Sequence, residues 1–173
     1  LTDNTIEAQY VAAQSRKKWL SEHASPFLNS PDTWGQALSS GMIDNLINAG
    51  LNKLWLGFDN WMPAFYQPNA VELAKQTGYL VGTYDSYNTA IPIELNDSWL
   101  TAQLPDPIRN TCAIEQANGA LKKGFRGKGF YLNPNCHLDY VKRRAKDIIN
   151  FGHFNSLFLD VDATAMARED YSD

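Results

Sequence analysis

The sequence predicts an α/β fold built on parallel strands. Short apolar segments alternate with longer stretches of helix-forming residues, and each apolar segment ends in Asp or Asn. The three apolar segments cover residues 54–58, 79–85 and 157–159. Helices that alternate with apolar strands are typical of parallel sheets with right-handed crossover connections. We therefore expect parallel β/α units rather than an antiparallel sandwich.

The composition is that of one folded domain. The chain has 173 residues, of which 44% are hydrophobic, and this is enough to form one core. Its net charge of −4 argues against nucleic acid or an anionic membrane as the partner, because both favour a basic surface. No apolar run approaches the roughly 18 residues that a membrane helix needs. We expect neither a nucleic-acid nor a membrane partner.

The first half of the chain predicts two helices before the first strand. Residues 5–22 are helix formers with apolar residues near the helical period. Asp32 or Thr33 can cap a second helix that ends before Gly50. The strand at residues 54–58 is predicted to be buried on both faces.

Between the first two strands, the stretch "NWMPAFYQP" is predicted to be irregular, and Pro68 then begins a helix over residues 69–77 that Gly78 closes. The second strand leads into a long irregular stretch from about residue 89 to 134. Within it, Asn118-Gly119 is a strong signal for a β-hairpin. A further helix is predicted over residues 138–151, ended by Gly152, before the third strand.

The cysteine and histidine content offers no metal site. Cys112 and Cys136 can pair in an oxidising compartment or remain two buried thiols, and the sequence leaves both open. The three histidines share no metal-ligand spacing, and no phosphate-binding glycine motif lies between a strand and a helix. We expect no metal and no cofactor.

Polar side chains follow all three predicted strands. They are Asp59, Asn60 and Trp61, then Asp85, Tyr87 and Asn88, and finally Asp160 and Asp162. In parallel α/β folds, binding and catalytic groups collect at the carboxyl ends of the strands. A lone Asp after a strand is commonly a turn former or helix cap, but the residues after Asp59 are predicted to be non-helical. Strand alternation predicts that Asp160 and Asp162 face the same side, and paired carboxylates are typical of functional sites.

Aromatic residues near the same strand ends point to a sugar ligand. They are Trp55, Trp61, Phe65, Tyr66, Tyr84, Tyr87 and Trp99, and about half of them are expected in the core. Aromatic rings can stack on the C–H faces of a sugar while carboxylates and amides bind its hydroxyls. We predict stacking by Trp61 and Tyr87, and hydrogen bonding by Asp59, Asn60, Asp85, Asn88 and Asp162.

Three stretches resemble the catalytic (β/α)8 barrel of glycoside hydrolases of families 101 and 129. They are "LWLGFDNW", "GYLVGTYDSYNTAIP" and "SLFLDVDAT", and the resemblance covers roughly residues 34–173. It implies a retaining, bacterial, extracellular or periplasmic enzyme that acts on α-linked N-acetylgalactosamine in oligosaccharides or glycoprotein glycans. In this family a strand of two apolar residues followed by Asp-Val ends in the nucleophile, so the resemblance gives this role to Asp160.

The sequence departs from the family's pattern in two respects. The family's acid/base lies on a later strand, and no residue here can be assigned that role by its motif. A closed barrel needs eight strands and typically about 250 residues, and this sequence has only three to four β/α units. We therefore expect residues 1–173 to form the N-terminal part of such a barrel, TIM-like and partial, with a hairpin-containing insertion at about 89–134. On its own this part is expected to lack activity and to associate with itself or with the rest of the barrel.

Two other interpretations remain open at this stage. A non-catalytic carbohydrate-binding or structural α/β module would use the same aromatics and amides without a second carboxylate. In such a module Asp160 would cap a helix or pair with Arg143, Arg144 or Lys146. A third possibility is another barrel hydrolase of the α-galactosidase type, with a similar strand-end Asp and a different pocket.

Overall fold

The computed structural model divides the chain into two compact units. It describes residues 5–34, 38–95, 99–162 and 168–172. The sheet unit comprises residues 1–83 and 144–158, and the insertion unit comprises residues 84–143 and 159–173. The boundary between the units falls inside two strands and one helix. Across the described residues, no helix is both long enough and apolar enough to cross a membrane.

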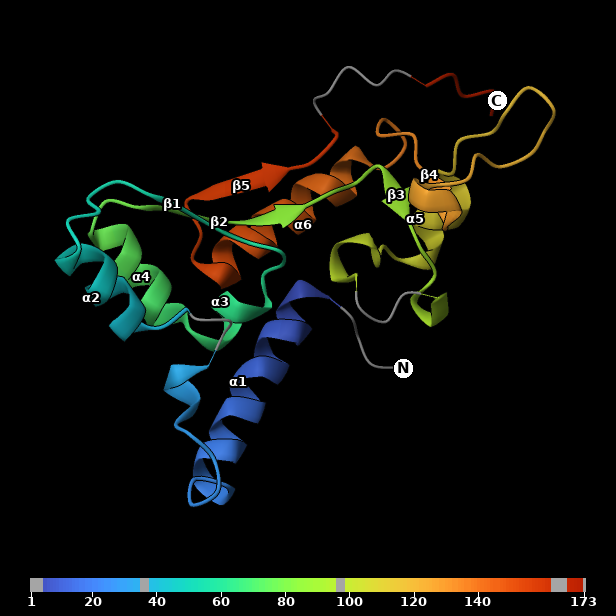
Figure 1. Cartoon of the computed structure of the whole chain (residues 1–173). Helices are drawn as coiled ribbons and strands as arrows, with labels where there is room; N and C mark the ends of the chain where they lie inside the picture. The colour runs from blue at the N-terminus through green and yellow to red at the C-terminus, as the bar shows by residue number, and fades with distance from the viewer. Residues whose placement is uncertain (1–4, 35–37, 96–98, 163–167, 173) are drawn as a thin grey trace. The chain divides into compact units, whose positions relative to one another are not determined.

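The sheet unit contains the parallel sheet that the sequence predicts. Its strands are ordered β1 (Trp55–Phe58), β2 (Leu80–Asp85) and β5 (Ser156–Leu159). β1 and β2 pair in parallel, with Trp55 opposite Leu80. β5 runs in the same direction as β2 (Figure 1). The predicted α/β class with parallel strands is therefore confirmed.

Asn155 aligns β5 with β2 just before β5 begins. Its Oδ1 accepts a hydrogen bond of 2.7 Å from the Val81 amide, and its Nδ2 donates to the Tyr79 carbonyl at 3.1 Å. The Asn155 amide also donates to the Val81 carbonyl at 3.1 Å. An asparagine side chain offers both a donor and an acceptor, so one residue fixes the register of β5 against its neighbour.

Most predicted helices of the sheet unit are confirmed, and one start is wrong. The structure has α1 (Ile6–His23), α2 (Ser40–Asn48), α3 (Met62–Tyr66), α4 (Pro68–Gln76) and α6 (Leu138–Gly152). α2 begins after Ser39, whose hydroxyl accepts from the Met42 amide, and not at Asp32 or Thr33. The Asp32 carboxylate instead pairs with Lys17 Nζ at 2.8 Å, and Pro31–Thr33 forms a short 3₁₀ helix.

The prediction of an irregular stretch after β1 is wrong. α3 follows almost directly, with Pro63 in its first turn, where a missing amide proton costs no helical hydrogen bond. The side chain of Asn60 accepts from the Met62 amide at 2.9 Å and so satisfies a donor at the start of this helix. Asn60 therefore has a structural role in this turn.

β1 is not buried on both faces, in contrast to the sequence prediction. Trp55, Leu80 and Phe158 are 48%, 52% and 49% exposed, and we call this set the open face of the sheet. The Trp55 ring lies over Gly57, where an added Cβ would come within 2.0 Å of it. Trp55 also meets the ring of Phe158 edge-on at 6.2 Å and donates from Nε1 to Ser156 Oγ at 2.8 Å.

Trp61 belongs to the core of the sheet unit. It is 1% exposed, and its Nε1 donates to Gln9 Oε1 on α1 at 2.9 Å. The guanidinium of Arg144 on α6 lies 4.9 Å from the centre of the Trp61 ring. The predicted sugar-stacking role of Trp61 is therefore corrected, because its ring is already covered by protein.

The insertion unit contains the predicted hairpin and more regular structure than expected. Glu115 bridges to Leu121, and the Gln116 amide donates to the Ala120 carbonyl at 2.9 Å, which confirms the hairpin. Gly119 takes a left-handed φ of 78° at its tip. The stretch predicted to be irregular also holds β3 (Thr89–Ala90), α5 (Asp106–Thr111) and β4 (Phe130–Tyr131), with β3 and β4 antiparallel.

A disulfide resolves the question that the sequence left open for the cysteines. Cys112, directly after α5, is bonded to Cys136, which precedes α6, and their Cα atoms lie 5.5 Å apart. The insertion unit also has a small hydrophobic core. Its buried members are Tyr87, Ala90, Leu104, Ala113 and Leu132.

We predict that removal of this disulfide destabilises the insertion unit. Replacing both cysteines by serine frees a loop with a sequence separation of 24 residues in the unfolded chain. The expected loss in the free energy of unfolding is about 2–4 kcal/mol. Urea unfolding followed by near-ultraviolet circular dichroism measures it. Reduced wild-type protein should match the variant, and equal stability of the oxidised and reduced wild type would contradict the prediction.

Candidate active site

β5 ends at Leu159, so the strand alternation predicted for Asp160 and Asp162 does not hold. Val161 between them has a left-handed φ of 71°. This conformation is uncommon for a β-branched residue and is typical of positions that the surrounding structure constrains for function. The Asp160 amide donates to the Asp85 carbonyl at 3.2 Å, which ties the start of this turn to the end of β2. As a result the two acids line different cavities, in contrast to the prediction.

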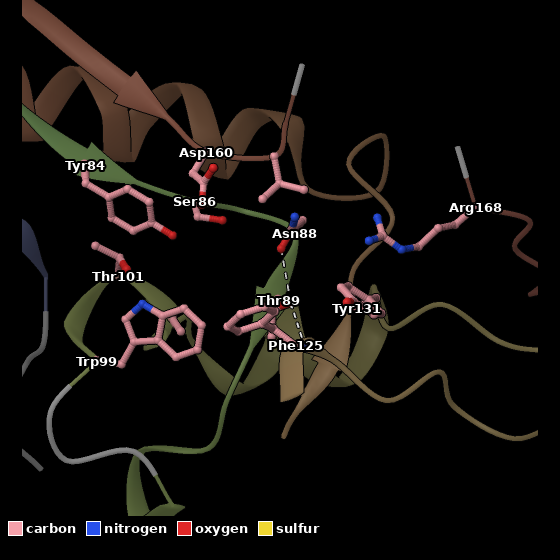
Figure 2. A pocket seen from close by; sticks show the side chains of 12 residues that line it. Tyr84, Ser86, Asn88, Thr89, Trp99, Thr101, Phe125, Tyr131, Asp160 and Arg168 are labelled. Carbon is pink, nitrogen blue, oxygen red and sulfur yellow. Dashed lines mark hydrogen bonds between the residues drawn. The ribbon is translucent and has the colours of Figure 1, made fainter. Parts of the chain in front are cut away.

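Asp160 lines a small cavity with aromatic walls, which we call the aromatic cavity. Its volume is about 120 Å³. Its principal side chains are Tyr84, Trp99, Phe125, Tyr131, Asp160 and Arg168. The rings of Trp99 and Phe125 meet edge-on with their centres 5.6 Å apart. Figure 2 shows Arg168 on the opposite side of the cavity from Tyr84 and Trp99.

The phenol of Tyr84 stays protonated in this setting. Burial raises its pKa above the ordinary value of 10.0, a hydrogen bond with the Ser86 side chain opposes this rise, and the negative charges of Asp160, Asp85 and Asp162 add to it. A protonated phenol can donate a hydrogen bond to a carboxylate or to a ligand oxygen. Tyr84 is therefore suited to orient an oxygen that lies close to Asp160.

Asp162 lines a second and larger cavity, which we call the polar cavity. Its volume is about 380 Å³. Polar side chains on its wall are Asn88, Asn133, Asn135, Asp162, Arg168 and Asp170. Asn88, Val161 and Arg168 line both cavities, so the two cavities adjoin.

The carboxyl of Asp162 has a pKa raised from 3.8 to about 6. Partial burial of the carboxyl is the largest cause, even though the residue as a whole is exposed. The negative charges of Asp85 and Asp160 add to it, while a hydrogen bond from the Tyr87 backbone amide limits the rise. Asp162 can therefore exchange a proton in the mildly acidic range.

Asp170 fixes the outer wall of the polar cavity. Its Oδ1 accepts from the Glu115 amide at 3.0 Å, and its Oδ2 accepts from Asn133 Nδ2 at 2.8 Å. The Glu115 bond is the main reason why the pKa of Asp170 falls to about 2, so this carboxylate stays ionised. Close in sequence, the Arg168 guanidinium lies 3.9 Å from the centre of the Tyr131 ring. We call the two hydrogen bonds of Asp170, with Glu115 and Asn133, the Asp170 clamp.

The structure brings some of the predicted site residues together in the insertion unit. Asp160, Asp162 and Asn88 line the two cavities. Asp85 is fully buried and its Oδ1 accepts from the Ser86 amide at 3.0 Å, so it shapes the turn after β2. Tyr87 borders the polar cavity but is only 4% exposed and packs in the core, which corrects its predicted stacking role.

The remaining predicted residues lie in the sheet unit. Asp59 is exposed, while Asn60 and Trp61 have the structural roles described above.

The sequence assigned no role to three side chains that line the aromatic cavity, Phe125, Tyr131 and Arg168. Tyr84 and Trp99 were noted only as aromatics near the strand ends. Tyr84 and Trp99 could have been found from the sequence because aromatic residues close to the predicted strand ends were already singled out. Phe125, Tyr131 and Arg168 carried no signal, because their position depends on how the insertion folds. Within the described part of the chain, no group of three or more His, Cys, Asp or Glu is placed to hold a metal ion.

Comparison with known proteins agrees with this architecture. Residues 45–173 match the family model described as glycosyl hydrolases related to the GH101 family, GH129. A search of curated proteins found no match.

Among solved structures, the chain is similar to the ligand-free α-N-acetylgalactosaminidase NagBb from Bifidobacterium bifidum. The TM-score is 0.50 at 23% identity, over 70% of this chain and 22% of that chain. The complex of the same enzyme with Gal-NHAc-DNJ matches with a TM-score of 0.50 at 18% identity, over 88% and 33% of the two chains. The chain thus spans between about a fifth and a third of these structures, and the likeness shows a shared fold.

We predict that Asp162 titrates near pH 6 and couples stability to pH. Its pKa in the folded protein lies above the unfolded value, so the stability it contributes is full below about pH 4 and is lost as the pH rises through about 6. Carbon-13 NMR of the Asp162 carboxyl should give this midpoint. Urea unfolding should show the wild type losing stability relative to Asp162→Asn over the same range. A midpoint near 3.8 would contradict the prediction.

Proposed function

The chain belongs to the glycosyl hydrolases related to the GH101 family, family GH129, and we propose that it supplies the nucleophile of a retaining glycosidase. The proposed substrate is α-linked N-acetylgalactosamine in an oligosaccharide or glycoprotein glycan. The observation that carries the proposal is the position of Asp160, directly after β5 in a cavity with aromatic walls. Aromatic walls next to a carboxylate suit a sugar, which presents both C–H faces and hydroxyls.

The proposed reaction is a double displacement at the anomeric carbon. The Asp160 carboxylate forms a bond to this carbon while the bond to the leaving oxygen breaks, and a second carboxylic acid protonates that oxygen. That group, now a carboxylate, then removes a proton from water, and the water oxygen bonds to the anomeric carbon as the bond to Asp160 breaks, which releases the sugar and restores the Asp160 carboxylate. Retaining enzymes place the two carboxyls about 5–5.5 Å apart. We propose that the second carboxyl comes from a later strand, because no residue of this chain matches the family's acid/base.

The aromatic cavity suggests which residues hold the sugar. Trp99 and Phe125 replace Trp61 and Tyr87 as the stacking candidates, since their rings line the cavity. Tyr84 can donate a hydrogen bond near Asp160, and Asn88 reaches both cavities. Asp59 remains a predicted binding residue and Asp85 a residue that shapes the site.

The setting of Asp160 favours an enzyme over a non-catalytic module. A structural Asp160 was expected to cap a helix or to pair with Arg143, Arg144 or Lys146. Asp160 lines the aromatic cavity, and the negative charges of Asp85 and Asp160 act on the carboxyl of Asp162. Clustered acids at a cavity are typical of a catalytic site.

We further propose that the chain is part of a (β/α)8 barrel, with the insertion at about 89–134. The support is the parallel order of β1, β2 and β5, and the open face, whose apolar side chains are typical of a surface that further structure covers. The disulfide supports an extracellular or periplasmic location in a bacterium, because such bonds persist in oxidising compartments.

The catalytic assignment predicts that Asp160→Asn in the full-length protein removes turnover. An amide of the same shape cannot attack the anomeric carbon, so the loss in kcat should be at least about a thousandfold. Hydrolysis of an aryl α-N-acetylgalactosaminide measures it, and circular dichroism checks the fold. Asp44→Asn, at an exposed position of α2, is the matched control. A tenth of the wild-type rate in Asp160→Asn would refute the assignment.

The barrel proposal predicts that the open face drives self-association of this chain. Leu80→Lys places a charge on this face at a position that is 52% exposed, so it should shift the chain towards monomer in sedimentation velocity. Leu51→Lys, at a position that is 43% exposed and outside the strands, should leave association unchanged. The same response in both variants would speak against the open face as the contact.

A further inference from the structure

We propose that a basic loop beside the aromatic cavity binds an oxyanion, a carboxylate or a sulfate ester, that an acidic glycan carries. The basic loop comprises residues 122–128, and its exposed cations are Lys123, Arg126 and Lys128. This inference rests on the proposed function for the class of substrate. It adds that the glycan is acidic outside the reacting sugar, and that its charged group is held outside both cavities.

The basic loop concentrates positive charge in a chain whose net charge is −4. Its four cations are Lys122, Lys123, Arg126 and Lys128. No Asp or Glu occurs from residue 116 to 138 to offset them. Among the residues that the structure describes, no carboxylate forms a salt bridge with any of the four. Clustered charges of one sign attract a ligand of the opposite sign, so the loop favours an anion.

Aromatic rings support two of the exposed cations. The Arg126 guanidinium lies 5.2 Å from the centre of the Phe125 ring, and Lys123 Nζ lies 5.0 Å from the centre of the Phe130 ring. A cation over an aromatic face is attracted by the ring, but it keeps its full charge. These contacts therefore position both cations and leave their charges available to an anion.

The backbone of the basic loop is closed on itself and strained at Arg126. The Gly124 amide donates to the Gly129 carbonyl at 3.1 Å. The Lys128 amide donates to the Phe125 carbonyl, also at 3.1 Å. Arg126 has a left-handed φ of 55°, a conformation that Gly or Asn adopts more easily than Arg does. Strained backbone of this kind is concentrated at functional sites, which singles out Arg126 as the principal anion-binding residue.

Phe125 links the basic loop to the proposed sugar site. Its side chain lines the aromatic cavity and meets Trp99 edge-on (Figure 2). Because the Arg126 guanidinium lies over the same ring, an anion bound to Arg126 lies next to a sugar in this cavity. The planar guanidinium can donate two parallel hydrogen bonds to the oxygens of one such anion.

The aromatic residues also favour a glycan over a membrane surface as the partner. A loop that binds an anionic membrane combines its cations with aromatic or apolar side chains that enter the lipid. Phe125 instead lines the aromatic cavity, and Phe130 is half-buried with Lys123 over its ring. We therefore infer an acidic glycan, which needs only the exposed charges.

The test measures binding of the full-length protein to polysaccharides by affinity electrophoresis. Hyaluronan supplies carboxylates, dextran sulfate supplies sulfate esters, and neutral dextran is the blank. The loop variant combines Arg126→Asn with Lys128→Gln, because Asn tolerates the left-handed conformation at position 126. Loss of two exposed charge contacts should weaken binding to one or both acidic polymers by roughly three- to tenfold. The polymer that responds identifies the anion, and added salt should weaken wild-type binding because it screens exposed charges.

Arg143→Gln with Lys146→Gln is the matched control variant. Both residues are exposed on α6, and the net charge changes by the same amount as in the loop variant. Equal binding by the loop variant and the control variant would overturn the inference, as would a wild type that binds neither acidic polymer. So would a loss seen only with vesicles that contain phosphatidylserine, which would indicate a membrane as the partner.

The activity of the wild type tests the proposed function separately. If the wild type cleaves no aryl α-N-acetylgalactosaminide, but the loop variant alone loses polysaccharide binding, the proposed function fails and the anion site stands. If the wild type cleaves this substrate, but the loop variant binds the acidic polymers as well as the control variant does, the anion site alone is refuted.

Discussion

The hydrogen bond from the Asp160 amide to the Asp85 carbonyl is the contact on which the site depends. It joins the first residue after β5 to the last residue of β2, and it holds Asp160 at the start of the left-handed turn at Val161. Buried polar backbone groups need partners, and this bond satisfies the carbonyl of Asp85, which is fully buried. Because of that turn, two acids that are only two residues apart line separate cavities.

This separation has an electrostatic consequence. Burial is the largest cause of the rise in the pKa of Asp162 to about 6, and the negative charges of Asp85 and Asp160 add to it. A nucleophile has to be ionised, whereas a residue that binds a sugar hydroxyl can act either with or without its proton. Asp162, which lines the polar cavity, can therefore take up a proton in the mildly acidic range.

The parts of the molecule that could be predicted from the sequence are those with a local signal. The alternation of helix formers and apolar segments located the parallel strands, Asn118-Gly119 located the hairpin, and the acids after the strands located the cavities. The errors have a shared cause, which is that burial and pairing depend on residues far along the chain. Trp61 follows a strand end as a binding residue would, yet Gln9 and Arg144 place it in the core. Arg168 is positioned by its contact with the Tyr131 ring and by the nearby hydrogen bonds of Asp170.

The sheet shows that a sequence pattern can correctly predict a strand without predicting which of its faces is covered. Leu54 to Phe58 has the apolar run of a strand covered on both faces, but the Trp55 ring lies across Gly57 and stays half exposed. On the neighbouring strand Gly82 leaves equally little room, since a Cβ there would come within 2.3 Å of Ser156 Oγ. Glycines at both positions let Trp55 and β5 approach the sheet closely. They leave an apolar surface, rather than a polar one, where a barrel would place further side chains. Leaving these apolar side chains in water costs free energy. The stability of the sheet therefore depends on whatever structure covers this face.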